Sequence, residues 1–214
     1  MKIQLVDYNE ELCVEWRKAF EGCNDVEVHC ADYFSVLTDC YCSPANSYGF
    51  LDGGIDNKFR KFYERNNIDV EKKLQDIIIG EFNNELLVGQ SVFLEFSRYT
   101  NKVPALIVAP TMRVPMKLPK DSVNVYLAMK AILNRLKYLE NFSPKLKSIS
   151  ISGLGTGIGQ LPYDLCAKQM KQAYNDFWVG EDYFPNSWGK AQDHHQLLYS
   201  DEVSGDLQYD KPKN

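Results

Sequence analysis

Asn46, Asp52 and Asp56 place an amide and two carboxylates in one glycine-rich segment, SPANSYGFLDGGID, which runs from Ser43 to Asp56. Asn46 offers both a donor and an acceptor, as a sugar hydroxyl requires, and Asp56 can orient or deprotonate a water molecule. The two aspartates also form a carboxylate pair, although aspartates in a glycine loop are more often turn formers than the acid and base of a glycosidase. The segment therefore predicts a loop that holds a ligand against bare backbone.

A second glycine-rich loop, GLGTGIGQLP, begins at Gly153, and its alternating glycines place bare N–H groups close together near a helix N-terminus. It is not a P-loop, because no lysine follows the glycines, and it is not a dinucleotide-binding loop, because Ile158 or Gln160 stands at the sixth position. Neither loop contains a lysine or an arginine. For either loop alone, glycines that only form tight turns are as good an explanation as phosphate binding. Together the loops predict a diphosphate held by backbone amides and helix dipole.

The segments that must position these loops alternate between strand and helix patterns, which indicates an α/β fold. The expected strands are residues 3–6, 26–30, 39–43, 91–96, 105–109 and 147–152, with a polar turn at 100–102. Helical spacing occupies residues 12–20, 55–64 and 70–82, a stretch from Ser122 to Leu139, a helix from Pro162 and a last helix within 186–200. Each glycine loop follows a strand, which is where ligands bind in open α/β sheets.

The two loops, in this order, resemble those of the macro domain, the ADP-ribose-binding module. The resemblance is strongest to its bacterial and phage branch, whose loop has the pattern S-P-A-N-S-[FY]-G-x-[ML]-D-G-G-I-D, and it spans roughly Ile3 to Phe177. It implies a three-layer α/β/α sandwich with a mixed central sheet. We accordingly expect one domain over residues 1–199, followed by a loose polar tail over residues 200–214.

The resemblance also implies roles for individual residues. Asp32, in CADYF, is similar to the acidic residue that accepts a hydrogen bond from the adenine amino group, and Asn46 to the asparagine that contacts the distal ribose. Asp56 is similar to the aspartate that serves the attacking water, so Asn46 and Asp56 are the candidate catalytic residues. The remaining candidates for ligand binding are Tyr33, Gly53, Gly54, Ile55, Gly155, Thr156, Gly157, Ile158 and Gly159.

The sequence departs from the hydrolase pattern at several positions. Leu51 and Asp52 stand where that branch has glycines, Gly159 replaces an aromatic residue, and Gln160 replaces a glycine. The resemblance implies a protein that binds ADP-ribose and hydrolyses an ADP-ribosyl linkage or an ADP-ribose derivative. The alternative that these departures leave open is a non-catalytic module that recognises or sequesters ADP-ribose or a related nucleotide signal.

Composition limits the partners. With 24 basic and 29 acidic side chains, a net charge of −5 argues against a broad nucleic-acid-binding surface, so nucleic acid is expected only as a modified substrate. Acidic residues interrupt the first apolar run and no apolar stretch reaches membrane-spanning length, so we expect a cytoplasmic monomer that binds no membrane. The six cysteines lack metal-site spacing and are expected to be reduced thiols, with no metal or cofactor.

Two further sets of side chains are assigned to the core. The stripe Val125, Met129, Ile132, Leu136 and Leu139 has the spacing of a buried helix face. The aromatic residues Trp178, Tyr183, Phe184 and Trp188 are expected to cap the core near the C-terminus, with the adenine pocket as the alternative place for them.

Overall fold

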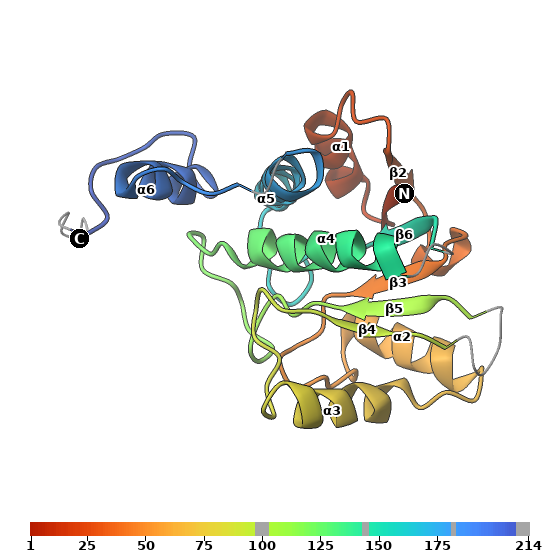
Figure 1. Cartoon of the computed structure of the whole chain (residues 1–214). Helices are drawn as coiled ribbons and strands as arrows, with labels where there is room; N and C mark the ends of the chain where they lie inside the picture. Colours follow the sequence, from red (N-terminus) through yellow and green to blue (C-terminus); the bar gives the residue numbers. More distant parts are fainter. Residues whose placement is uncertain (97–102, 143–145, 181–182, 209–214) are drawn as a thin grey trace.

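A computed structural model describes residues 1–96, 103–142, 146–180 and 183–208, without the side chains of 141 and 142 (Figure 1). The strands are β1 (Lys2–Asp7), β2 (Val26–Cys30), β3 (Cys40–Ser43), β4 (Val92–Leu94), β5 (Ala105–Val108) and β6 (Ser148–Ile151). The α-helices are α1 (Glu10–Ala19), α2 (Gly54–Glu64), α3 (Val70–Glu81), α4 (Asn124–Phe142), α5 (Tyr163–Tyr174) and α6 (Trp188–Leu197). A short 3₁₀ turn, η1 (Tyr33–Ser35), and a π-helical turn, η2 (Asn175–Val179), complete the elements. The expected turn at 100–102 lies outside the described residues.

The strands form one sheet in the order β2-β1-β6-β3-β5-β4. Every neighbouring pair is parallel except β4 and β5, which run antiparallel, so the sheet is mixed as expected. Because β1, β6 and β3 are adjacent and parallel, their carboxyl ends lie at the same edge of the sheet. Both glycine loops and the residues that follow β1 start from this edge.

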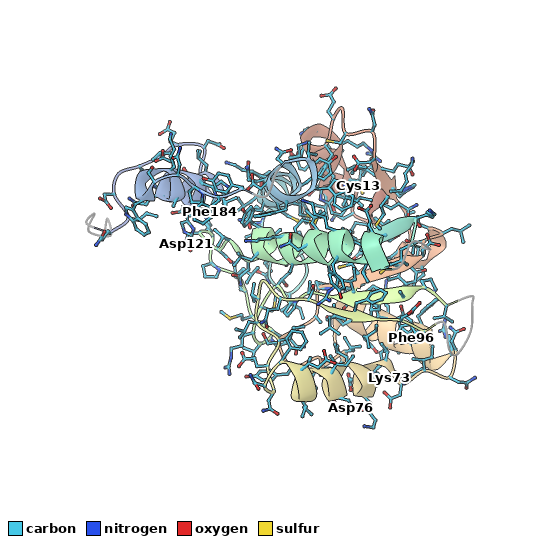
Figure 2. All side chains as sticks on the ribbon, in the orientation of Figure 1. Cys13, Lys73, Asp76, Phe96, Asp121 and Phe184 are labelled. Carbon is cyan, nitrogen blue, oxygen red and sulfur yellow. The ribbon has the colours of Figure 1, made fainter. Side chains whose placement is uncertain are left out.

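Helices cover both faces of the sheet, which confirms the three-layer arrangement (Figure 1). Two clusters of buried side chains fill the space between the layers. The first contains Cys13 of α1, the α4 stripe and Cys166 of α5, and the second contains Phe59 of α2 and Leu74 of α3. Figure 2 shows Cys13 and Phe96, one from each cluster, on opposite sides of the sheet.

The α4 prediction is confirmed in detail, because Val125, Met129, Ile132, Leu136 and Leu139 are all buried. The helix begins at Asn124, whose backbone N–H donates to the Ser122 hydroxyl at 3.3 Å. All six cysteines are free thiols, and both Cys40 and Cys42 of β3 lie in the first buried cluster. Across the described residues, no helix is both long and apolar enough to span a membrane.

The C-terminal aromatic residues do not form the expected cap. Phe184, just before α6, is 88% exposed, and Trp188, the first residue of α6, is 66% exposed, because α6 extends away from the sheet (Figures 1 and 2). Tyr183 stacks on His194 of α6, and Trp178 alone packs partly against the core while its indole N–H donates to Asp25. The described part of the expected loose tail folds back on α6, where the Leu207 N–H donates to the Gln192 side chain at 2.7 Å.

Candidate functional site

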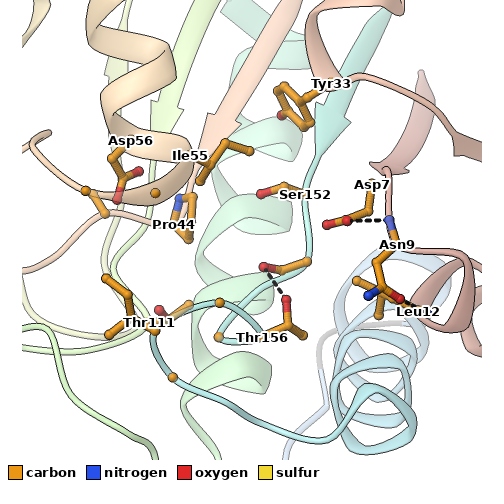
Figure 3. Close-up of a pocket in the computed structure, with 18 of the residues that line it drawn as sticks. Asp7, Asn9, Leu12, Tyr33, Pro44, Ile55, Asp56, Thr111, Ser152 and Thr156 are labelled. Atoms are coloured by element: carbon orange, nitrogen blue, oxygen red, sulfur yellow. Dashed lines mark hydrogen bonds between the residues drawn. The ribbon is translucent and has the colours of Figure 1, made fainter.

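A cavity of about 360 Å³ opens at the carboxyl ends of β1, β3 and β6 (Figure 3). Its volume falls in the range typical of small-molecule sites. Both glycine loops line it, together with the residues that follow β1. The lining includes every residue that the sequence singled out for binding or catalysis except Asp32 and, of the carboxylate pair, Asp52.

The two glycine loops approach each other across this cavity. A Cβ atom built on Gly53 would lie 3.7 Å from the Ile158 side chain, which is ordinary van der Waals contact. Gly53 is also the N-cap of α2 and provides no side-chain hydrogen bond to the first turn, while Gly54 has a φ of +52°, a conformation that favours glycine. The uncapped amides of α2 therefore provide a favourable place for an anion.

The second loop folds back on itself and leaves amides available. The Leu161 N–H donates to the Gly155 carbonyl and the Gln160 N–H to the Gly157 carbonyl, each at 3.1 Å. In the described parts of the chain, the N–H groups of residues 156–159 donate to no protein acceptor. A Cβ atom on Gly157 would meet nothing within 4 Å, so the fold itself does not require glycine there.

The structure shows how the backbone accommodates the two departures in this loop. A Cβ atom on Gly159 would lie 2.4 Å from the Gly155 carbonyl oxygen, so this backbone admits no side chain at the position of the family's aromatic residue. Gln160 has a φ of +50°, which means that it keeps the left-handed backbone expected of the glycine it replaces. The left-handed conformation of Gln160 costs about 1 kcal/mol or more in strain.

Asp56 lies in the first turn of α2, and its carboxylate points toward the cavity wall near Pro44 (Figure 3). The Ser43 hydroxyl donates to its Oδ1 at 2.5 Å. Burial, with a smaller contribution from nearby Asp52, raises the pKa of Asp56 from 3.8 to about 6, against the lowering effect of the hydrogen bonds from Ser43 and the Ala45 backbone. At neutral pH the carboxyl group is ionised and can accept a proton, as a general base must.

Asn46 is buried, and its side chain organises the first glycine loop. Its amide nitrogen donates to the Phe50 carbonyl at 2.8 Å, and its amide oxygen accepts from the N–H groups of Tyr48 at 3.1 Å and Phe50 at 3.3 Å. The sequence predicted a ribose contact for this side chain. The structure gives it a loop-forming role and leaves it one N–H for a ligand.

Asp32, the expected adenine contact, is the residue that the structure does not bring to the cavity. Its carboxylate caps η1 by accepting from the Phe34 N–H at 3.0 Å. The next residue, Tyr33, lines the cavity instead, and its hydroxyl donates to the carbonyl groups of Cys42 and Ser150 in the sheet. The acidic side chain that does line the cavity near this place is Asp7.

Sequence reasoning missed several lining residues, among them Asp7, Asn9, Lys58 and Ser152. Lys58 lies one half-turn beyond Asp56 on α2, and its ammonium group is 5.7 Å from the centre of the Tyr8 ring, so a cation lines the cavity although neither glycine loop contains one. The sequence feature that could have identified Lys58 is its position two residues after Asp56. Asp7 and Ser152 carried no local signal, because only the pairing of β1 with β6 brings them together.

Comparisons with known proteins agree with this geometry. The sequence model of the family described as Macro domain matches residues 42–170, which contain both glycine loops. The chain belongs to the macro domain family. The match extends over more than half of this macro domain, and β1, α1, β2 and α6 lie outside the matched residues.

Relatives of this macro domain are distant in sequence. A protein of Aquifex aeolicus described as uncharacterized is 27% identical over 153 residues, which cover 72% of this chain and 82% of the relative. The macrodomain of Mycobacterium tuberculosis DarG superposes with a TM-score of 0.55 at 16% identity, covering 68% of this chain and 86% of the other. Thermosipho africanus DarTG in complex with ADP-ribose superposes with a TM-score of 0.54 at 15% identity, covering 80% of this chain and 50% of the other. These likenesses show a shared fold.

Proposed function

We propose that this macro domain binds ADP-ribose and hydrolyses an ADP-ribosyl linkage, which releases ADP-ribose from a modified macromolecule or from an ADP-ribose derivative. The observation that carries the proposal is the convergence of two glycine loops with available amides on one cavity. Backbone amides and the N-terminus of α2 suit the two phosphate groups. The structurally similar Thermosipho africanus protein, whose complex contains ADP-ribose, supports this choice of ligand.

In this proposal the ligand is divided between the two loops. Lys58 is the cation in the described lining of the cavity, and it attracts the diphosphate toward the amides of residues 156–159. The distal ribose then lies beside the first loop, whose shape depends on Asn46. Close approach of the ligand at Gly157 is possible because no Cβ atom occupies the open space there.

Asp56 is the general base in this proposal. Its carboxylate orients a water molecule and takes one of its protons as the water oxygen bonds to the anomeric carbon of the distal ribose. The bond from that carbon to the target breaks at the same time, and the leaving atom keeps the bonding electrons and is protonated by solvent. The hydroxyl of Ser43 holds the carboxylate in place throughout, since it donates to the Oδ1 atom.

The alternative function is a reader that binds ADP-ribose without turnover. The observation that favours it is that both candidate catalytic side chains serve the loop: Asn46 bonds to loop backbone, and Asp56 accepts from Ser43 and the Ala45 N–H. Either function is proposed for a cytoplasmic monomer whose partner is an ADP-ribosylated molecule, with nucleic acid included only as a modified substrate.

Product analysis separates the two functions. Wild type and Asp56→Asn are incubated with a panel of substrates that carry ADP-ribose on carboxylate, hydroxyl, guanidinium and nucleobase groups, and released ADP-ribose is measured by chromatography. Release by the wild type that falls by about 100-fold or more in the variant supports hydrolysis, since this is the scale of a general base. Binding of ADP-ribose without release from any substrate contradicts hydrolysis and leaves the reader.

A further inference from the structure

Two cysteines meet where α1 packs against the end of β2. Cys13 is fully buried in α1, and its thiol donates to the Asp7 carbonyl at 3.4 Å while lying 3.9 Å from the His29 carbonyl oxygen. Cys30, the last residue of β2, is exposed and is the register partner of Asp7 in β1. The Cys30 thiol is also a hydrogen-bond partner of Cys13. A buried thiol and an exposed thiol are therefore in contact at this point of the fold.

Both thiols also contact the turn between β1 and α1. The Cys30 sulfur lies 3.8 Å from the Tyr8 carbonyl oxygen, and the Cys13 thiol donates to the preceding carbonyl, that of Asp7. The residues of this turn, Asp7, Tyr8 and Asn9, line the cavity. The two thiols thus contact a segment that forms part of the cavity wall.

The two thiols differ in their access to solvent and in their acidity. Burial, with smaller contributions from Cys30 and Asp7, raises the pKa of Cys13 to about 12. Cys13 therefore remains a thiol at neutral pH and is shielded from solvent. Cys30 is open to solvent, and its sulfur lies 3.6 Å from a Glu10 carboxylate oxygen that can accept from the S–H group. Cys30 is accordingly the thiol of this pair that a dissolved oxidant reaches first.

We propose that Cys13 and Cys30 form a reversible disulfide when the protein meets hydrogen peroxide, and that this disulfide weakens ligand binding in the cavity. The Cys30 sulfur attacks one peroxide oxygen, the O–O bond breaks, and the leaving hydroxide takes up the thiol proton as water. The Cys13 sulfur then attacks the sulfenic acid on Cys30, the S–O bond breaks, and the hydroxide that leaves takes up the proton of Cys13 as a second water. The two thiols are oxidised and the peroxide is reduced. A thiol reductant reverses the change by exchange.

The disulfide acts on the cavity through the turn between β1 and α1. A disulfide carries no S–H group, so its formation removes both thiol donors from this turn, while the Asp7 carbonyl keeps the Ala31 N–H at 3.0 Å. The wall formed by residues 7–9 is then less firmly held, and a ligand that needs this wall must order it on binding. This effect rests on the proposed function, because ADP-ribose is the ligand concerned. Formation of the disulfide does not depend on that function.

Peptide mapping tests the disulfide itself. The wild type is treated with hydrogen peroxide, its remaining thiols are alkylated, and digestion with Glu-C and chymotrypsin releases Cys30 in residues 28–33, apart from the other cysteines. Mass spectrometry is expected to find this peptide joined to the peptide that contains Cys13, and dithiothreitol should separate the two. Cys23→Ser is the matched control and should form the same link, because Cys23 is a half-buried thiol that contacts Lys171 outside the pair.

Two variants separate the roles of the thiols. Cys30→Ser changes an exposed position and should leave Cys13 reduced after peroxide treatment, since the buried thiol does not meet the oxidant. In Cys13→Ala, Cys30 should persist as a sulfenic acid that dimedone traps, because its partner thiol is missing. A wild-type Cys30 that stays fully reduced in peroxide, or that is joined to a cysteine other than Cys13, overturns the proposal.

Calorimetric titration with ADP-ribose, before and after oxidation, tests the effect on the cavity. The oxidised wild type is expected to bind about fivefold more weakly, the scale of a lost hydrogen bond, and to recover in dithiothreitol. Peroxide-treated Cys30→Ser should bind like its untreated form. Equal affinity of the linked and the reduced wild type overturns the effect on ligand binding. A wild type that binds no ADP-ribose in either state overturns the proposed function, while the mapping still decides whether the disulfide forms.

Discussion

The Ser43 hydroxyl donates to the Asp56 carboxylate at 2.5 Å, which joins the last residue of β3 to the first turn of α2. The hydrogen bond fixes the two ends of the first glycine loop relative to each other. It also holds a half-buried carboxylate at the cavity wall, where burial raises its pKa to about 6. The Asp56 side chain therefore both fixes the loop and provides the candidate general base.

Turnover is expected to follow the ionisation of Asp56. A general base is active when deprotonated, so the rate of ADP-ribose release should rise with pH through about 6 and level off above about 7. Asp56→Asn should lower the rate by about 100-fold or more and change ADP-ribose affinity only a few fold, because the base serves the transition state. Rate and affinity are measured over the same pH range. Equal rates in wild type and variant would remove Asp56 from the mechanism.

Stability should depend on the same carboxyl group with the opposite trend. The folded-state pKa lies above the unfolded value of 3.8, so the folded protein binds the proton more tightly and loses stability as pH rises from about 4 to about 6. A difference of about two pKa units corresponds to at most about 3 kcal/mol. Asp56→Asn stays neutral at every pH. The difference in unfolding free energy between Asp56→Asn and the wild type should therefore shift in favour of the variant by up to this amount from pH 4 to pH 8. Urea titrations at each pH measure it.

The control for this stability effect is Asp52→Asn. Asp52 is exposed and contributes only a minor part of the Asp56 pKa shift, so its removal should change the pH dependence little. A wild type and an Asp56→Asn variant with parallel pH profiles would contradict the assignment of a raised pKa to Asp56.

Asn46→Ala is expected to damage the loop as well as ligand binding. It removes the bond to the Phe50 carbonyl and the two bonds from the Tyr48 and Phe50 N–H groups, and leaves these partly buried backbone groups without their partner. The unfolding free energy should fall by about 1 to 3 kcal/mol. Asn46→Asp keeps an accepting oxygen and should lose less. Normal thermal melting of Asn46→Ala together with abolished binding would show that the side chain serves the ligand and not the loop.

Lys58 should contribute to affinity through charge. Lys58→Met keeps the aliphatic stem and removes the cation near the diphosphate, so ADP-ribose affinity should fall several-fold at low salt and less at high salt. Lys61→Met is the matched control, because Lys61 is exposed on the same helix and does not line the cavity. The measurement is a titration at two ionic strengths, and equal losses for the two variants would argue against a direct role for Lys58.

Much of the fold follows from local sequence patterns, and much of the site does not. The α4 stripe and the strands before both glycine loops were predictable because each periodicity is local. The positions of Asp7 and Ser152 were not, because they depend on the parallel pairing of β1 with β6 across more than a hundred residues of sequence. The exposed aromatic residues beside α6 were assigned to the core because composition alone cannot show that a helix extends away from the sheet.

The orientation of single side chains could not be predicted from the sequence either. Asp32 stands at the position expected of the adenine contact, but one oxygen of its carboxylate accepts from the nearby Phe34 N–H and the residue does not line the cavity. The left-handed backbone at Gln160 could not be predicted either, because glutamine rarely adopts this conformation. Both features are decided by the folded backbone around the residue.

Calorimetric titration of the wild type and of Gly157→Val with ADP-ribose tests the central claim most directly. A Cβ atom at position 157 would meet no protein atom within 4 Å, so the variant should melt like the wild type while blocking the phosphates. Gly189→Val, an equally open position on α6, is the matched control and should bind normally. The account predicts a saturable one-to-one isotherm for wild type and control and no measurable binding for Gly157→Val. A wild type that gives no saturable heat, or a Gly157→Val isotherm equal to that of the wild type, would contradict it.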